Sequence, residues 1–177
     1  MITTRELLNI VPGFDIMSDD EKFMDAAFRE ALKAYECGEV PIGCVIVKDG
    51  QIIGRGYNQV ETLKDATAHA EIIAIGTAAA KLENWRLEGA SLYVTLEPCP
   101  MCAGAILNSR VSRVVYGSPD SRFGACGTRS DVIAGNALER VVEVVGGVHA
   151  EDCLGLLQQF FREMRARKGD SGQKTVC

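Results

Sequence analysis

Two short segments constrain this chain more than any other part of its sequence. They are residues 67–71 (TAHAE) and residues 97–102 (EPCPMC). In the second segment, Pro98 is placed to end a strand and Pro100 to open a helix, because proline is tolerated in the first turn of a helix and not in its interior. Both cysteines then lie at one helix N-terminus, where the helix dipole favours the thiolate that binds a metal ion. The fold must therefore deliver a strand directly into a helix at this point.

Cys99 and Cys102 are predicted to be two ligands of a zinc ion, and His69 in the first segment is predicted to be the third. A zinc site with three protein ligands keeps one position open for water, which is the pattern of catalytic rather than structural sites. Thr67 is the expected N-cap of a helix whose first turn holds His69 and Glu71. Side chains two residues apart point to opposite sides of a helix, so these two can share a site only at the helix end.

Glu71 is expected to act as the general acid and base of this site rather than as a ligand. Zinc lowers the pKa of a bound water toward about 7, and a neighbouring carboxylate can take that proton and deliver it to the substrate. The combined pattern H-x-E…P-C-x-x-C is the signature of zinc deaminases that act on nucleobases. A Cys-x-x-Cys pair alone would also fit a structural zinc knuckle or a redox pair, but neither has a use for Glu71.

Length and composition indicate one soluble domain. With 177 residues and 47% hydrophobic content, the chain can build a single sizeable core. No apolar run approaches the roughly 18 residues that a membrane span requires, and the N-terminal residues lack the features of a signal peptide. The seven cysteines are therefore expected to be reduced, in a cytoplasmic protein. Those outside the predicted metal site are expected to be core residues or free thiols: Cys37, Cys44, Cys126, Cys153 and Cys177.

The apolar pattern predicts a three-layer α/β/α sandwich with a mixed sheet of about five strands. A capping box at Ser18 and Glu21 opens the first helix, and the turn Asp49-Gly50 joins two strands into an antiparallel hairpin. The later strands alternate with helices, which implies parallel pairing. Strands are expected at 41–47, 51–57, 91–96, 113–116 and 141–145, helices at 100–108 and 151–167, and a loop with at most one short helix at 117–135.

The domain is expected to span residues 18–168, between a dispensable N-terminal extension (1–17) and a disordered tail (169–177). His149 is expected to start the last helix rather than to bind a metal. From residue 160 onward, five basic residues stand against two acidic ones, in a chain of net charge −5. A basic C-terminal segment on an acidic body suits a small nucleic-acid footprint, although a solvated helix face would carry the same charges.

The last helix is predicted to turn an apolar stripe toward the body of the domain. The stripe consists of Leu154, Leu157, Phe160 and Phe161. Neighbouring residues lie about 100° apart around a helix, so one phenylalanine can be buried while the next lies at the edge. Phe160 is expected in the core and Phe161 at the surface.

From Asp19 onward, the chain resembles the bacterial tRNA-specific adenosine deaminases of the cytidine deaminase-like superfamily. The strings that carry the resemblance are EVPIG (39–43), GYN (56–58), DATAHAE (65–71), YVTLEPCPMCAGA (93–105) and FFR (160–162). The resemblance implies hydrolysis of adenosine to inosine at the wobble position of a tRNA anticodon, by a homodimer with one catalytic zinc ion per chain and no organic cofactor. Ala66 departs from the family, which usually has proline there, and this bears on loop stiffness rather than on chemistry.

The same resemblance assigns four residues to substrate binding. Asn58 would lie in the substrate pocket, and the Ala70 amide would help to hold the zinc-bound oxygen or the base. Phe161 and Arg162 would approach the RNA. Without the resemblance, Asn58 would more simply be read as a turn residue. Two other classes of function are a deaminase of free nucleobases or nucleosides, which shares the chemistry but not the pocket, and a non-catalytic zinc module, which has no use for Glu71.

Overall fold

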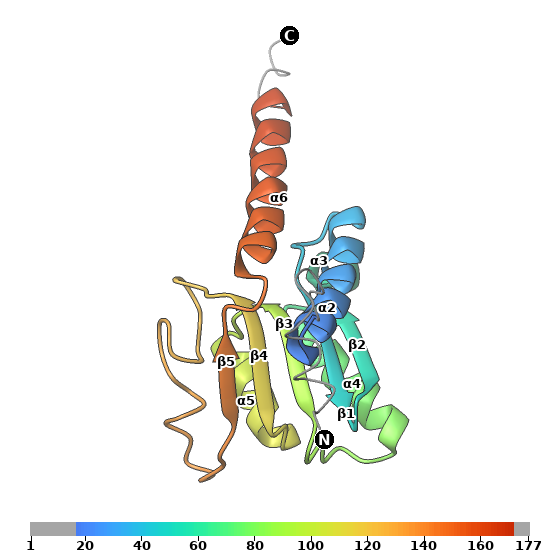
Figure 1. Cartoon of the computed structure of the whole chain (residues 1–177). Helices are drawn as coiled ribbons and strands as arrows, with labels where there is room; N and C mark the ends of the chain where they lie inside the picture. The colour runs from blue at the N-terminus through green and yellow to red at the C-terminus, as the bar shows by residue number, and fades with distance from the viewer. Residues whose placement is uncertain (1–16, 172–177) are drawn as a thin grey trace, which may run out of the picture.

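Five strands form one mixed sheet in the order β2-β1-β3-β4-β5 in the computed structural model, which describes residues 17–171 (Figure 1). β1 pairs antiparallel with both β2 and β3, whereas β3, β4 and β5 run parallel. The predicted mixed sheet, with its hairpin first and its parallel strands later, is confirmed. The strands are β1 (Gly43–Lys48), β2 (Gln51–Tyr57), β3 (Ser91–Leu96), β4 (Arg113–Ser118) and β5 (Glu143–Gly146).

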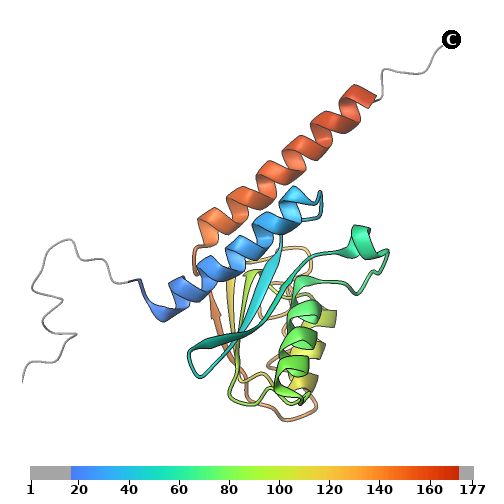
Figure 2. The same ribbon diagram turned by 90° about the vertical axis from the view of Figure 1, so that its right-hand side faces the viewer.

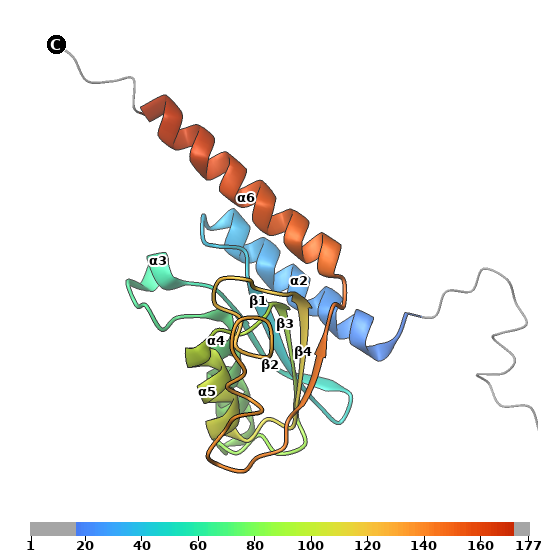
Figure 3. The same cartoon turned by 90° about the vertical axis from the view of Figure 1, so that its left-hand side faces the viewer.

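Helices cover both faces of the sheet, which confirms the three-layer sandwich. Figures 2 and 3 show α2 (Asp19–Glu36) and α6 (Ala150–Ser171) on one face, and α4 (Ala70–Leu82) and α5 (Pro100–Ser109) on the other. The short helix α3 (Val60–Leu63) follows β2. The C-terminal half of α6 extends beyond the sheet (Figure 1). No helix in the described part of the chain combines the length and the apolarity that a membrane span requires.

Two apolar cores result, because successive side chains of a strand point to opposite faces. Cys44 and Ile46 of β1 belong to the core between the sheet and the pair α4 and α5. Val45 and Val47 belong to the core on the α2 side of the sheet. The central strands are thus buried on both faces, and for this reason they read as continuous apolar runs in the sequence.

Local signals in the sequence placed the first elements correctly. The Ser18 hydroxyl accepts a hydrogen bond from the Glu21 backbone nitrogen at 3.2 Å, and the Glu21 carboxylate accepts one from the Ser18 nitrogen at 2.6 Å. This is the predicted capping box of α2. Asp49 and Gly50 both have positive φ, 50° and 71°, as the central residues of a tight hairpin turn require.

Two expectations about local structure are wrong, and a third is confirmed. Thr67 does not cap α4, because its hydroxyl donates to Asp65 Oδ1 at 2.7 Å and His69 occupies the N-cap position instead. After the end of β4, residues 119–135 form a loop, as predicted, with turns and an isolated bridge and without the short helix that the prediction allowed. Leu154 is 44% exposed, because the stretch of α6 that carries it borders a cavity rather than the core.

The ends of the chain are only partly described. The predicted extension (1–17) lies outside the described residues except for Met17, and its dispensability stays a prediction. α6 continues to Ser171, past the expected helix end at residue 167, and the rest of the predicted tail lies outside the described residues. Cys177 lies there too. Of the other cysteines away from the predicted metal site, Cys37 is an exposed free thiol, and Cys44, Cys126 and Cys153 are buried free thiols.

The helix α4 packs close against β2 because β2 has a glycine at the contact. A Cβ atom on Gly54 would lie 2.8 Å from the Cβ of Ala78 and still closer to the carbonyl oxygen of Ala74. We expect Gly54→Ala to lower the free energy of unfolding by about 1–3 kcal/mol, because α4 must move away from the sheet. Urea unfolding measures this change.

Gly76 gives a matched control within the same helix, since a Cβ atom there would meet nothing within 4 Å. Gly76→Ala is expected to leave the stability unchanged or to raise it by about 1 kcal/mol, because alanine favours a helix interior. Equal stabilities for the two variants would show that the close packing of α4 on β2 is unimportant.

Candidate active site

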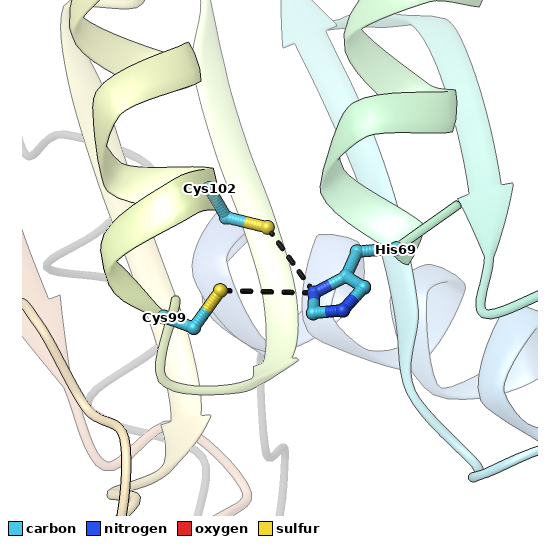
Figure 4. A group of neighbouring side chains, drawn as sticks. All are labelled: His69, Cys99 and Cys102. Carbon is cyan, nitrogen blue, oxygen red and sulfur yellow. Dashed lines mark hydrogen bonds between the residues drawn. The ribbon is translucent and has the colours of Figure 1, made fainter. Parts of the chain in front are cut away.

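Three side chains that can bind a metal ion meet where α4 and α5 begin. His69 is the N-cap residue of α4, and Cys99 is the N-cap residue of α5. Cys102 lies in the first turn of α5. Figure 4 shows the imidazole ring and the two thiols pointing toward one another from these two helix starts. Neither N-cap residue uses its side chain to cap its own helix, so both side chains are free for the shared site.

The spacing of these atoms fits one zinc ion. His69 Nδ1 lies 3.7 Å from Cys99 Sγ and 3.5 Å from Cys102 Sγ. Two ligands at tetrahedral zinc, with Zn–S of about 2.3 Å and Zn–N of about 2.0–2.1 Å, are separated by about 3.6 Å. Among the described residues, no other group of three His, Cys, Asp or Glu side chains is close enough to share an ion. The three predicted ligands are therefore together, with an arrangement suited to zinc.

The three groups also perturb one another electrostatically. The neighbouring Cys102 thiol and the His69 ring lower the pKa of Cys99 to about 4. Hydrogen bonding to Cys99, together with burial, raises the pKa of Cys102. The Cys99 sulfur raises the pKa of His69. One thiolate is thus already favoured at the position where a zinc ligand has to be deprotonated.

Glu71 lies beside this cluster without belonging to it. Its side chain is 4% exposed and comes from the first turn of α4. Burial raises its pKa above the ordinary value, because the charged form loses its hydration. A carboxyl group in this environment is suited to hold a proton and to pass it on.

A cavity of about 1120 Å³ opens from His69, Glu71 and Cys99 toward the surface. One wall comes from the end of β2 and from α3, a second from the loop 119–123, and a third from α6. Pockets for drug-sized ligands typically measure about 300–1,000 Å³. This cavity therefore has room for more than a free base.

Two of the predicted substrate residues lie on the inner part of this cavity. Asn58 is 6% exposed, and its Nδ2 atom donates a hydrogen bond to Glu39 Oε2 at 3.1 Å. Ala70 is fully buried at the first position of α4, where a backbone N–H has no partner within the helix. Both residues therefore line the same cavity as His69 and Glu71.

The other two predicted substrate residues lie at the outer part, on α6. Phe161 is 43% exposed, whereas its neighbour Phe160 is 7% exposed and packs edge-on against Tyr35. Arg162 also lines the cavity, and its guanidinium donates to Gln159 Oε1 at 2.7 Å. Phe160 is thus buried and Phe161 lies at the surface. Arg165, which the sequence did not single out, lines the same wall.

Two buried carboxylates near the cavity were missed by reasoning from sequence. Glu97 is 2% exposed and accepts hydrogen bonds from the backbone nitrogens of Asp120 and Cys126 at 3.0 Å and of Thr128 at 3.1 Å. It therefore holds the loop wall against the end of β3. Glu39 is 1% exposed and accepts hydrogen bonds from the wall that β2 and α3 form. The sequence signal for both residues was an acidic side chain next to a predicted apolar strand, which indicates a buried carboxylate.

Comparison with known proteins places this site in a family. Residues 17–118 match the family model described as the cytidine and deoxycytidylate deaminase zinc-binding region. The tRNA-specific adenosine deaminase of Bacillus subtilis is 51% identical over 152 residues, which cover 86% of this chain and 94% of that protein.

Solved structures agree with this comparison. A structure from a study of A-to-I editing by tRNA:A34 deaminases at the wobble position has a TM-score of 0.74 and 41% identity, and the match covers 76% of this chain and 98% of that one. The guanine deaminase of Bacillus subtilis has a TM-score of 0.55 and 38% identity, over 70% of this chain and 82% of that one. With a zinc-suited cluster, a buried glutamate beside it and half of its aligned residues identical to those of the Bacillus subtilis tRNA-specific adenosine deaminase, the chain belongs to the tRNA-specific adenosine deaminase family of zinc deaminases.

Proposed function

We propose that this protein converts adenosine to inosine by hydrolysis at the wobble position of tRNA anticodons, with one zinc ion per chain. One observation carries the proposal: a single cavity joins the His-Cys-Cys cluster and Glu71 to an exposed aromatic and two arginines of α6. Chemistry suited to a nucleobase and a basic surface suited to a nucleic acid are thus continuous.

His69, Cys99 and Cys102 would hold the zinc ion, which when bound supplies a Lewis acid that activates water. Glu71 takes the proton from the attacking water and delivers it to the purine ring. The same carboxyl group then assists the departure of the amine. Water adds at C6 of adenine, the C6–N6 bond breaks, and ammonia and inosine are the products.

Asn58 and Ala70 are proposed to hold the base while this proton moves. The backbone N–H of Ala70, at the start of α4, would donate to the reacting oxygen or to the base, and Asn58 would contact the nucleoside. Support comes from their burial and their place on the inner cavity. Fixing the base in one orientation lowers the entropic part of the barrier.

The anticodon stem-loop is proposed to lie across the outer cavity. Proteins read RNA mostly in single-stranded loops, where bases can be turned outward and stacked on aromatic side chains. Phe161 offers such a ring, and Arg162 and Arg165 offer cations for the phosphates. We also propose a homodimer, as the family resemblance implies, and a cytoplasmic location, which fits both a tRNA substrate and the free cysteines.

The competing function is deamination of a free base, because the chain is also similar to a guanine deaminase. Substrate choice separates the two. Purified protein is incubated with tRNA that carries adenosine at the wobble position and, separately, with free adenine, guanine, cytosine and their nucleosides. The proposal requires ammonia release from the tRNA at a rate far above that from any free compound, and the reverse preference would overturn it.

Phe161→Ala is expected to weaken tRNA binding by about 1–3 kcal/mol with little loss of stability, because the exposed ring would stack on an RNA base.

Arg162→Ala should raise the KM for tRNA and flatten the dependence of binding on salt, since one fewer phosphate contact releases about one fewer counterion. Filter binding over a range of salt concentrations measures the affinity and its salt dependence, and steady-state kinetics measures the KM.

Phe160→Ala is the matched control for this pair of adjacent rings. Because Phe160 is buried, its removal is expected to cost about 3–5 kcal/mol of stability, without altering the salt dependence of tRNA binding by the folded protein. If the Phe161 variant unfolded early and bound tRNA normally when folded, the proposed RNA contact would be wrong.

A further inference from the structure

Glu39 is a buried carboxylate whose hydrogen bonds all go to the wall of the cavity that carries Asn58. Its Oε1 atom accepts from the Thr62 backbone nitrogen at 2.6 Å, and its Oε2 atom accepts from the Glu61 backbone nitrogen at 3.2 Å. Both nitrogens belong to the first turn of α3. Oε2 also accepts from Nδ2 of Asn58 at 3.1 Å. Glu39 therefore links the backbone of α3 to the side chain of Asn58.

These three accepted hydrogen bonds favour the ionised form of Glu39. Burial raises its pKa, but the hydrogen bonds from Thr62 and Glu61 outweigh that effect and lower the pKa below the ordinary value. An ionised carboxylate can only accept hydrogen bonds. The amide nitrogen of Asn58, not its oxygen, accordingly faces Glu39, and the 3.1 Å hydrogen bond holds the amide in that orientation.

The fixed orientation determines what Asn58 offers to a ligand. One N–H of Nδ2 is committed to Glu39. The second N–H and the oxygen Oδ1 remain, and among the described residues none donates a hydrogen bond to Oδ1, which is not sealed away from solvent. Asn58 thus presents a donor and an acceptor side by side on the cavity surface.

We infer that Glu39 is a positioning residue for the reaction: it holds the Asn58 amide in the one orientation that presents both an acceptor and a donor to the substrate nucleoside. The inference rests on the proposed function. A purine nucleoside offers ring nitrogens that accept and ribose hydroxyls that donate, so it can satisfy both positions. A freely rotating amide would present the wrong pattern for part of the time and leave a buried polar group unpaired.

The test is a double-mutant cycle on kcat/KM for tRNA with Glu39→Gln and Asn58→Ala. Glutamine keeps the size of the side chain but replaces one acceptor with a donor, which frees or inverts the Asn58 amide. Glu39→Gln is expected to lower kcat/KM about tenfold in the wild-type background, the rate equivalent of one hydrogen bond. In the Asn58→Ala background the same substitution should cost less than twofold. The zinc content should not change in any variant.

Glu97→Gln is the matched control, because Glu97 is equally buried and accepts hydrogen bonds from backbone nitrogens of the opposite wall. It has no contact with Asn58, so its fold loss in kcat/KM should be the same in both backgrounds. If Glu39→Gln behaved like Glu97→Gln, with equal losses in both backgrounds, Glu39 would only support α3 and the inference would be overturned. The absence of any loss in the wild-type background would overturn it as well.

A second variant keeps the inference testable if Glu39→Gln does not fold. Asn58→Asp places a carboxylate within hydrogen-bonding distance of Glu39, and it should lower the melting temperature because two like charges then face each other. Adding Glu39→Gln should restore part of that loss, since the glutamine amide can donate to the new carboxylate. A double variant no more stable than Asn58→Asp would contradict the pairing.

Failure of the proposed function would be seen separately, in the wild-type protein. If wild-type protein released ammonia from guanine and not from tRNA, the same cycle would be measured on guanine. The ratio between the two backgrounds, rather than the absolute rate, decides whether Glu39 acts through Asn58.

Discussion

Replacing Glu71 with glutamine is expected to lower kcat by a factor of about 10²–10⁴ while the protein keeps its zinc and its fold. Glu71 is buried beside the His-Cys-Cys cluster, and burial raises the pKa of its carboxyl group. Glutamine has nearly the same shape but cannot take a proton from water or give one to the leaving amine. The loss should therefore fall on the chemical step and not on tRNA binding.

Two measurements on the same sample check this result. Inosine formation under single-turnover conditions reports the chemical step, and elemental analysis reports zinc per chain. Loss of zinc from the Glu71→Gln protein would make Glu71 a ligand rather than a proton carrier. Activity close to that of the wild type would remove it from the mechanism altogether.

Substitution of a metal ligand is expected to act differently, through both zinc and stability. Cys99→Ala removes one of three ligand atoms that lie within 4.8 Å of one another, so the protein should be purified without zinc and without activity. An ion that binds only the folded state stabilises it by about 4 kcal/mol when its free concentration is 1,000 times its Kd. For a domain of this size, that corresponds to a fall in Tm of roughly 8–16 °C.

A chelator separates loss of metal from loss of packing. It should lower the Tm of the wild-type protein and leave the Tm of Cys99→Ala unchanged. Cys153→Ala is the control, because Cys153 is a buried thiol in the core on the opposite face of the sheet. This variant should lose stability through the cavity it creates but keep its zinc, its activity and its sensitivity to the chelator. Full zinc content in Cys99→Ala would show that the ion binds elsewhere.

The features that the sequence predicted well are those that depend on contacts between residues close together in the chain. A capping box and a hairpin turn depend on contacts within four residues, and both were found at the expected positions. The metal cluster was predictable for a different reason. Cys99 and Cys102 lie where a strand runs into a helix at Pro98 and Pro100, and His69 lies where another helix begins. These local signals place the functional groups at helix starts without information from distant segments.

Other features depend on contacts between distant segments, which a single sequence does not specify. Threonine is a common N-cap residue, but the Thr67 hydroxyl donates a hydrogen bond to Asp65 and the helix begins three residues later. Leu154 follows the apolar period of α6 and yet is exposed, because burial also requires a partner surface. The roles of Glu39 and Glu97 were hidden for the same reason: their partners are backbone nitrogens more than twenty residues away.

The most direct measurement for the whole account is the position at which inosine forms in tRNA. A tRNA with adenosine at the wobble position and the same tRNA with guanosine there are incubated with the purified protein, and inosine is mapped by sequencing, where it is read as guanosine. The account predicts conversion at the wobble position of the first tRNA, none elsewhere in it, and no inosine in the second. Inosine at other adenosines, or ammonia released only from a free base, would contradict it.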